Sequence, residues 1–73
     1  MNPIFVYRTS VRGEAEVRRL RPVLNRLVNA GGRWNFDLED SDNILRVESA
    51  VLPSAAIVNT LKGAGFECEE LPD

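Results

Sequence analysis

The chain has 73 residues, 44% of them hydrophobic and 27% charged, which is the composition of a single small soluble domain spanning residues 1–73. It holds one Cys and no His, and it lacks a run of about 18 apolar residues, so an intramolecular disulfide and a membrane-spanning helix are excluded. The N-terminal residues have neither the basic start nor the small-residue cleavage site of a signal peptide, so we expect a cytoplasmic protein.

The net charge of −2 conceals a division along the chain. Residues 1–33 contain seven Arg against two Glu, a net charge of +5, whereas residues 34–73 contain two basic and nine acidic side chains, a net charge of −7. Whether this division persists in space depends on how the two halves fold together.

The first half of the chain is expected to form a strand and then a helix. Residues 4–9 are dense in β-branched and aromatic side chains, with apolar residues on both faces, which predicts a central strand. From Glu14 the apolar period becomes that of an amphipathic helix. Gly13 is expected to cap this helix, Glu14 and Glu16 to favour its positive end, and Pro22 to kink it. The apolar stripe consists of Val17, Leu20, Val23, Leu24, Leu27 and Val28.

The helix is expected to stop at residues 30–32, and a β-hairpin follows it. Residues 34–38 and 44–48 alternate apolar with polar side chains, and the polar residues 39–43 between them predict the turn. The inward side chains of the hairpin are predicted to be Trp34, Phe36, Leu38, Leu45 and Val47.

Pro53 suits the first position of a second helix, whose buried stripe contains Ile57 and Leu61, and residues 63–65 end it. Residues 66–71 predict a short last strand. This order of elements is that of a ferredoxin-like βαββαβ plait, an α+β fold with a four-stranded antiparallel sheet (order 4-1-3-2) and two helices on one face. The first loop, the hairpin turn and the end of the second helix then lie together, and we expect much of the charge division to cancel locally.

Three hydrophobic patterns extend over nearly the whole chain, in residues 17–27, 36–49 and 57–66. Their spacing resembles that of the heavy-metal-associated domains, the copper-chaperone-like family. The resemblance implies the ferredoxin-like fold and, for typical members, a Met-x-Cys-x-x-Cys metal motif across the first loop and first helical turn. In this chain the helix register places Val11 at the Met position and Gly13 and Glu16 at the two Cys positions.

The thiolate and thioether groups that soft ions such as copper(I) need are therefore missing from the motif positions. Cys68 and Met1 are the only soft ligands in the chain, and we expect Cys68 to be a small buried side chain of the last strand. The carboxylates of Glu39, Asp40 and Asp42 lack the spacing of a calcium loop and are expected to form a solvated turn. We therefore expect neither a metal nor a cofactor.

Catalysis is not expected, because the chain has no His and no Ser, Thr or Lys with an evident base beside it. One candidate small-ligand site is an anion contact where the first loop leads to the free N–H groups of a helix start. Its residues are Arg8, Ser10, Arg12 and Gly13. The alternative is that both Arg pair with the carboxylates of Glu39, Asp40 or Glu67. Nucleic acid is not an expected partner, because the sequence pI is about 5.0 and the third strand offers no aromatic side chain for base stacking.

A contact with a protein partner, or with a second copy of the chain, is the expected role. Ile4, Val6 and Ile44 are predicted to point to the side of the sheet that the helices leave uncovered, next to Arg46. A small apolar patch with a charged rim suits a protein contact, although isolated surface aliphatic side chains without a role are the competing interpretation. We therefore predict a protein-interaction module on a heavy-metal-associated-like scaffold. The alternative is a noncanonical metal-ion carrier or an anion-binding module that uses the first loop.

Overall fold

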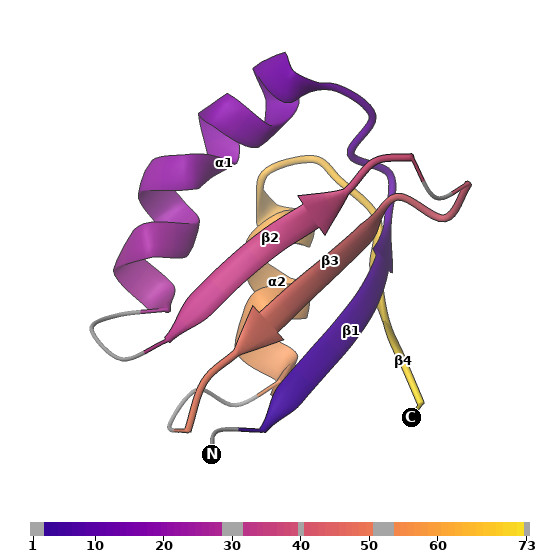
Figure 1. Cartoon of the computed structure of the whole chain (residues 1–73). Coiled ribbons are helices and arrows are strands. Elements are labelled where there is room, and N and C mark those ends of the chain that lie inside the picture. The colour runs from indigo at the N-terminus through magenta and orange to yellow at the C-terminus, as the bar shows by residue number, and fades with distance from the viewer. Residues whose placement is uncertain (1–2, 29–31, 40, 51–53, 73) are drawn as a thin grey trace.

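The computed structural model describes residues 3–28, 32–39, 41–50 and 54–72 and is shown in Figure 1. Within these residues the predicted order of strands and helices is confirmed. The elements are β1 (Ile4–Thr9), α1 (Glu14–Leu27), β2 (Arg33–Asp37), β3 (Ile44–Glu48), α2 (Ser54–Gly63) and β4 (Cys68–Leu71). Asp40 of the predicted turn, Pro53 at the predicted helix start and residues 30 and 31 of the predicted helix stop lie outside the described residues.

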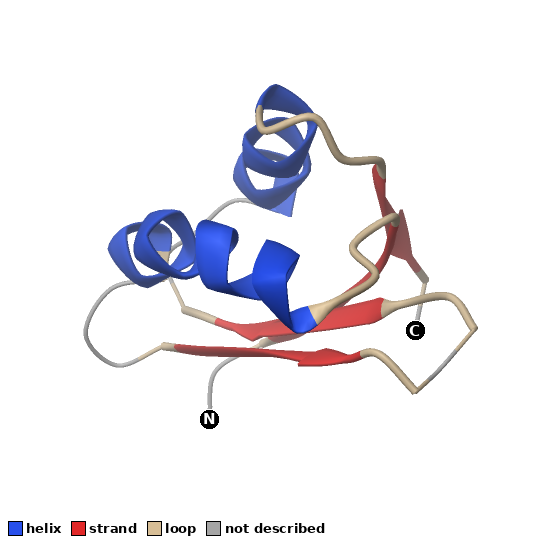
Figure 2. Ribbon diagram, turned by 90° about the horizontal axis from the view of Figure 1, so that it is seen from above, coloured by secondary structure: helices blue, strands red, loops and turns tan. Residues whose placement is uncertain are grey.

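The four strands of the described residues form one antiparallel sheet in the order β2-β3-β1-β4. This is the predicted order read from the opposite edge, so the strand pairing and the α+β class are confirmed. Both helices lie on the same side of the sheet, and the described residues leave its other side uncovered (Figure 2). That uncovered side is called the open face below.

α1 is one continuous helix although Pro22 lies within it. Gly13 is its N-cap residue, as predicted, with an extended backbone and no side-chain cap. The helix ends at Leu27, before the predicted glycine stop, since Val28 leaves the helical conformation. The Val28 N–H still donates to the Leu24 carbonyl oxygen at 2.8 Å and so closes the last turn.

The end of α2 is a Schellman motif, which sets where β4 begins. Gly65 has a φ of +95°, a conformation that favours glycine, and its N–H donates to the Lys62 carbonyl oxygen at 3.0 Å. The Phe66 N–H donates to the Leu61 carbonyl oxygen at 2.9 Å. Phe66 therefore belongs to the helix end, and β4 begins at Cys68, two residues later than predicted.

The core lies between the sheet and the two helices. Tyr7 and Leu45 stand opposite each other on β1 and β3 and are both 0% exposed, and Leu24 and Leu61 belong to the same buried cluster. The predicted inward direction of these strand positions is therefore confirmed. Side chains that are partly buried against this cluster include Phe5, Trp34, Phe36 and Leu38.

Candidate functional site

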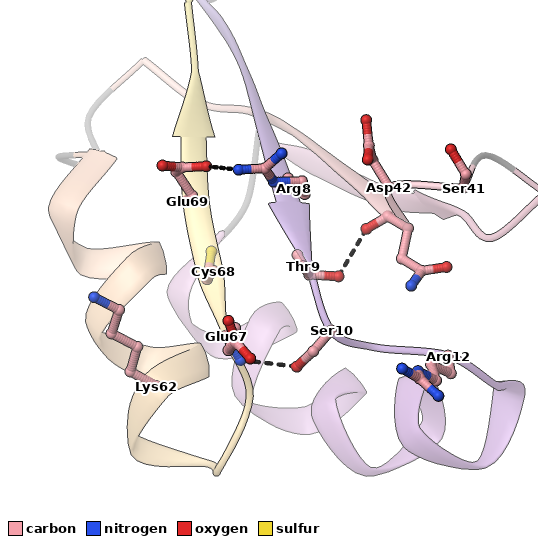
Figure 3. A pocket seen from close by; sticks show the side chains of 11 residues that line it. Arg8, Thr9, Ser10, Arg12, Ser41, Asp42, Lys62, Glu67, Cys68 and Glu69 are labelled. Carbon is pink, nitrogen blue, oxygen red and sulfur yellow. Dashed lines mark hydrogen bonds and ion pairs between the residues drawn. The ribbon is translucent and has the colours of Figure 1, made fainter.

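Three segments that are distant in the sequence meet at one end of the molecule: the first loop, the β2–β3 turn and the start of β4. Between them lies an open cleft of about 580 Å³, which we name the loop-end cleft (Figure 3). Lys62, near the end of α2, also lines this cleft, so the predicted meeting of the first loop, the hairpin turn and the end of the second helix is confirmed. The charged side chains that line the loop-end cleft are Arg8, Arg12, Lys62, Asp42, Glu67 and Glu69. Since three are basic and three are acidic, the cleft has no net charge to attract an anion.

Thr9 joins the first loop to the β2–β3 turn. Its N–H donates to the Asp42 carbonyl oxygen at 3.2 Å, and its hydroxyl donates to the Asn43 carbonyl oxygen at 2.7 Å. The same hydroxyl oxygen accepts the Val11 N–H at 3.2 Å. Because Thr9 is only 7% exposed, these bonds satisfy polar groups that water reaches poorly. The N–H and the hydroxyl of Thr9 thus fix the start of the first loop to the β2–β3 turn.

The anion-contact residues predicted from the sequence are mostly held by other contacts. Arg8 forms an ion pair with Glu69, which stands directly opposite it on β4. The Ser10 N–H donates to the Glu67 carbonyl oxygen at 3.1 Å, and the Ser10 Oγ accepts the Glu67 N–H at 2.8 Å. Arg12 lines the cleft with an exposed side chain that forms no ion pair with a described residue. The structure therefore brings Arg8, Ser10 and Arg12 together without forming a ready anion site.

The positions that the resemblance assigns to a metal motif lie at the start of α1 or in the core. The Gly13 carbonyl oxygen accepts the N–H groups of Glu16 and Val17, each at 3.1 Å, and Glu16 Oε1 accepts the Arg12 N–H at 2.7 Å. The backward bond of Glu16 resembles a capping box. Val11, at the Met position, is 0% exposed in the core. Among the described residues, no group of three or more Cys, His, Asp or Glu side chains is placed to hold a metal ion.

Cys68 is a buried core residue, as predicted, and is 5% exposed. Its burial raises the thiol pKa from 9.0 to about 11, although Lys62 acts in the opposite direction. The thiol is therefore protonated at neutral pH. Since the thiolate is the nucleophile and metal ligand, Cys68 is poorly suited to either task.

We expect the free energy of unfolding to fall by roughly 1 to 2 kcal/mol between about pH 8 and pH 10.5 on account of Cys68. Its pKa is raised to about 11 in the folded state, so the stabilisation is complete below pH 9.0 and is lost as the pH rises toward 11. Urea unfolding at both pH values measures the decline. Cys68→Ala should show a smaller decline, with a remainder from Tyr7, whose pKa burial also raises. An equal decline in both proteins would contradict the assignment.

The open face carries a short row of aliphatic side chains. Ile4 is 53% exposed, and Val6 is partly exposed on the same face of β1. Leu71 stands directly opposite Val6 on β4 and is also partly exposed, so it extends the row. We name Ile4, Val6 and Leu71 the apolar strip. Sequence reasoning missed Leu71. The alternation of β4 indicated its direction, because Leu71 lies on the same face of the strand as Glu69.

Ile44 points to the open face, as predicted, because it stands opposite Arg8, but it is only 5% exposed, so its predicted place in an exposed patch is wrong. Arg8 and Asp37 stand directly opposite it on the two neighbouring strands, and side chains on both sides of a central strand cover it. Arg46, also assigned to the patch, is exposed, and its Nη1 lies 3.8 Å from Asp37 Oδ2. Arg46 therefore belongs to the charged rim beside the strip.

The aromatic side chains of β1 do not reach the open face. Tyr7 is fully buried on the helix side, where its hydroxyl lies 3.1 Å from Ser54 Oγ and donates to the Ser54 carbonyl oxygen at 3.3 Å. Phe5 shares that side by strand alternation. The described strands therefore do not form the stacking platform with which a four-stranded sheet binds RNA.

A second depression, of about 530 Å³, lies between α1 and β2, and we name it the edge groove. Trp34 and Phe36 line it, with ring centroids 5.9 Å apart in a T-shaped arrangement. The Trp34 Nε1–H donates to Asn25 Oδ1 at 2.8 Å and so joins β2 to α1. Arg18 and Arg21 line the groove from the helix. Sequence reasoning missed this groove, because neither the helical nor the strand period shows how the two elements are spaced.

The arginines of α1 form no ion pair with any residue that the structure describes, but carboxylates lie close to them. Arg18 and Arg21 share the edge groove with Glu14 and Glu39. The Arg19 guanidinium lies 5.9 Å from the centroid of the Phe66 ring, at the start of the acidic C-terminal segment. The helix lies by the β2 edge of the sheet, while the acidic β4 lies at the opposite edge (Figure 1). Part of the charge division along the sequence therefore remains between the two edges of the sheet, while carboxylates beside the α1 arginines offset the rest.

No protein-family model matches the chain, and no significant match was found among curated proteins or among solved structures. In the described part of the chain, neither helix is long and apolar enough to cross a membrane.

Proposed function

We propose that the chain is a small cytoplasmic protein-interaction module with a ferredoxin-like fold of the heavy-metal-associated type, whose metal motif has been replaced by residues that start α1. The fold assignment is supported by the order of elements, the strand order and the placement of both helices on one side of the sheet. The loss of the metal role is supported by Val11, Gly13 and Glu16, which pack in the core or bond the helix start.

The observation that carries the interaction role is the apolar strip on the open face. Ile4 is one of the large hydrophobic side chains that the described structure exposes, and Val6 and Leu71 adjoin it in register rather than lying scattered. Apolar area removed from water stabilises a complex by roughly 25 cal/mol per Å², so covering the strip would stabilise a complex with a partner. The paired charges of Arg8 and Arg46 beside it form a polar rim.

The two alternatives from the first loop have less support. A metal carrier needs soft or clustered ligands, and Cys68, the soft ligand among the described residues, is buried with a raised pKa. An anion site needs free cationic donors, and Arg8 is engaged by Glu69. Neither alternative is favoured by a specific contact, so the open face is the better candidate.

A photoreactive amino acid at position 4 tests this role in cells that express the chain. We expect an adduct of discrete mass from position 4 and none from the exposed position 55 of α2, which serves as the matched control. Leu71→Asp should lower the yield at position 4 at least about fivefold, because it places a charge in the contact. Equal yields at both positions would contradict the role.

An amide-shift titration of the labelled protein with copper(I), zinc(II) and phosphate distinguishes the metal-carrier and anion-site alternatives from the interaction role. Stoichiometric, tight metal binding that shifts the amides of residues 8–14 would replace the interaction role with that of a carrier. A phosphate shift in the same residues that Arg12→Ala abolishes would instead establish the anion site.

A further inference from the structure

β2 forms an edge of the sheet and is open to a further strand. It pairs with β3 alone, and its residues make no backbone–backbone hydrogen bond to any other described residue. The outward N–H and C=O groups of an edge strand can pair with a strand of another chain. The edge groove lies between this strand and α1, so a strand added to β2 places every second side chain on the side of the groove.

The edge groove has an apolar floor that is held in place. Trp34 and Phe36 line it from β2 and Val17 lines it from α1, and all three are partly buried against the core. The bond from the Trp34 Nε1–H to Asn25 Oδ1 and the T-shaped contact with Phe36 fix the indole ring. An apolar side chain that enters the groove therefore meets a surface that needs little ordering, which lowers the free-energy cost of binding.

One end of the edge groove is acidic. Trp34, near the start of β2, bonds Asn25 near the end of α1, so the start of α1 lies towards the end of β2 (Figure 1). Glu14 is the first residue of α1 and Glu39 follows β2, and both line the groove. The two carboxylates therefore stand at the same end of it.

The arginines of the groove stand farther along α1. Arg18 and Arg21 follow the acidic end by about one and two helical turns, and both are exposed and form no ion pair with a described residue. On its open-face side β2 has the same order of charge, from Arg33 to Asp37, although Asp37 lies near Arg46. The groove thus has no net charge, but its charges change from acidic to basic in the direction opposite to β2. A ligand that carries two opposite charges in the matching order is favoured over one that carries them in the reverse order.

We propose that the β2 edge binds an extended segment of a partner protein that carries a basic, an apolar and an acidic side chain at alternate positions, in that order. An antiparallel strand beside β2 runs from the acidic end of the groove to its basic end. Its basic side chain then lies by Glu14 and Glu39, its apolar side chain lies over the aromatic floor, and its acidic side chain lies by Arg21. Glu14 and Arg21 are separated by about 10 Å along the helix, and four residues of a strand span about 13 Å, a difference that long side chains bridge.

Two synthetic peptides of identical composition test the proposal. The first is acetyl-Thr-Lys-Thr-Leu-Thr-Glu-Thr-amide, and the second exchanges its Lys and Glu, so both have no net charge and differ only in the order of charge. Amide-shift titration of the whole labelled chain at about 20 mM salt, where such charges are weakly screened, measures both dissociation constants. We expect the first peptide to shift the amides of β2 and the Trp34 indole N–H, with a dissociation constant of about 1 mM or less. Its dissociation constant should be at least about fivefold lower than that of the second peptide.

A charge exchange within the groove tests whether its own charges set this preference. Glu14→Arg/Arg21→Glu keeps the net charge but removes the order of charge, so the two peptides should bind within about twofold of each other. Binding of both peptides also shows that this variant is folded. The matched control, Arg12→Glu/Glu67→Arg, exchanges charges in the loop-end cleft and should keep the preference of the parent chain.

The proposal is overturned by equal affinity of the parent chain for the two peptides, or by a preference that the exchange within the groove leaves intact. The absence of shifts in β2 up to about 10 mM peptide also overturns it. Leu71→Asp alters the apolar strip on the open face and should leave both dissociation constants unchanged. The proposed contact at Ile4 uses that other face, so either proposal can fail while the other stands.

Discussion

Leu24→Ala is expected to lower the free energy of unfolding by about 3 to 4 kcal/mol. The Leu24 side chain is 0% exposed and belongs to the cluster that joins α1 to the sheet, so its removal loses buried apolar area and leaves a cavity. A domain of this size has a stability of roughly 5 kcal/mol, so the variant should be largely unfolded at moderate urea concentrations. Urea unfolding followed by the fluorescence of Trp34, the only Trp, measures the loss.

Leu27→Ala is the matched control, because it makes the same change one turn later on the same helix. Leu27 is only partly buried, so we expect a cost of about 1 kcal/mol. Equal losses at both positions would show that α1 does not present Leu24 to the core as described. A change in the slope of the urea transition for either variant would mean that the unfolded state had changed instead.

The elements and their inward sides were predictable because each rests on a local period. The stripe of α1 and the alternation of β1 and β3 direct Tyr7, Leu24 and Leu45 to the core without knowledge of the fold. The strand order then followed from the order of elements alone. The role of Gly13 and Glu16 at the start of α1 was predictable in the same way, because capping depends on residues close together in the chain.

The site was less predictable, because exposure and pairing depend on neighbouring strands. Ile44 has the right alternation for the open face, yet in its position between Arg8 and Asp37 it is only 5% exposed. The alternative to the anion contact paired Arg8 with Glu39, Asp40 or Glu67, and in the structure Arg8 pairs with Glu69 instead. The register between β1 and β4 decides that partner, and a pattern in one strand does not show the register.

The division of charge gives the clearest case of this difference. The sequence showed the basic and acidic halves, and the expected cancellation assumed that α1 would lie against the acidic strand. The strand order places β4 at one edge and β2 at the other, and the Trp34–Asn25 bond holds α1 to β2. The charge division was therefore correctly predicted from composition, while its spatial consequence depends on where α1 lies over the sheet, which the strand order alone does not give.

Gly32→Ala and Gly63→Ala are expected to change stability in opposite directions. A Cβ atom at Gly32 would lie 2.6 Å from Val28 Cγ1, 2.9 Å from the Glu48 carbonyl oxygen and 3.0 Å from the Val28 carbonyl oxygen. Two of these three atoms belong to the backbone and move only with α1 and β3, so we expect Gly32→Ala to cost about 2 to 3 kcal/mol.

A Cβ atom at Gly63 meets nothing within 4 Å, and Gly63 is the last residue of α2, where Ala is the better helix former. Gly63→Ala should therefore raise the free energy of unfolding by about 0.5 kcal/mol, mainly by restricting the unfolded chain. Urea unfolding of the two variants beside the parent chain measures both changes. The sequence marked Gly32 only as part of a helix stop. If Gly32 had no further role, Ala would be tolerated there as well as at Gly63. A decrease in the free energy of unfolding of less than about 0.5 kcal/mol for Gly32→Ala would show that Gly32 does not approach Val28 and β3 closely.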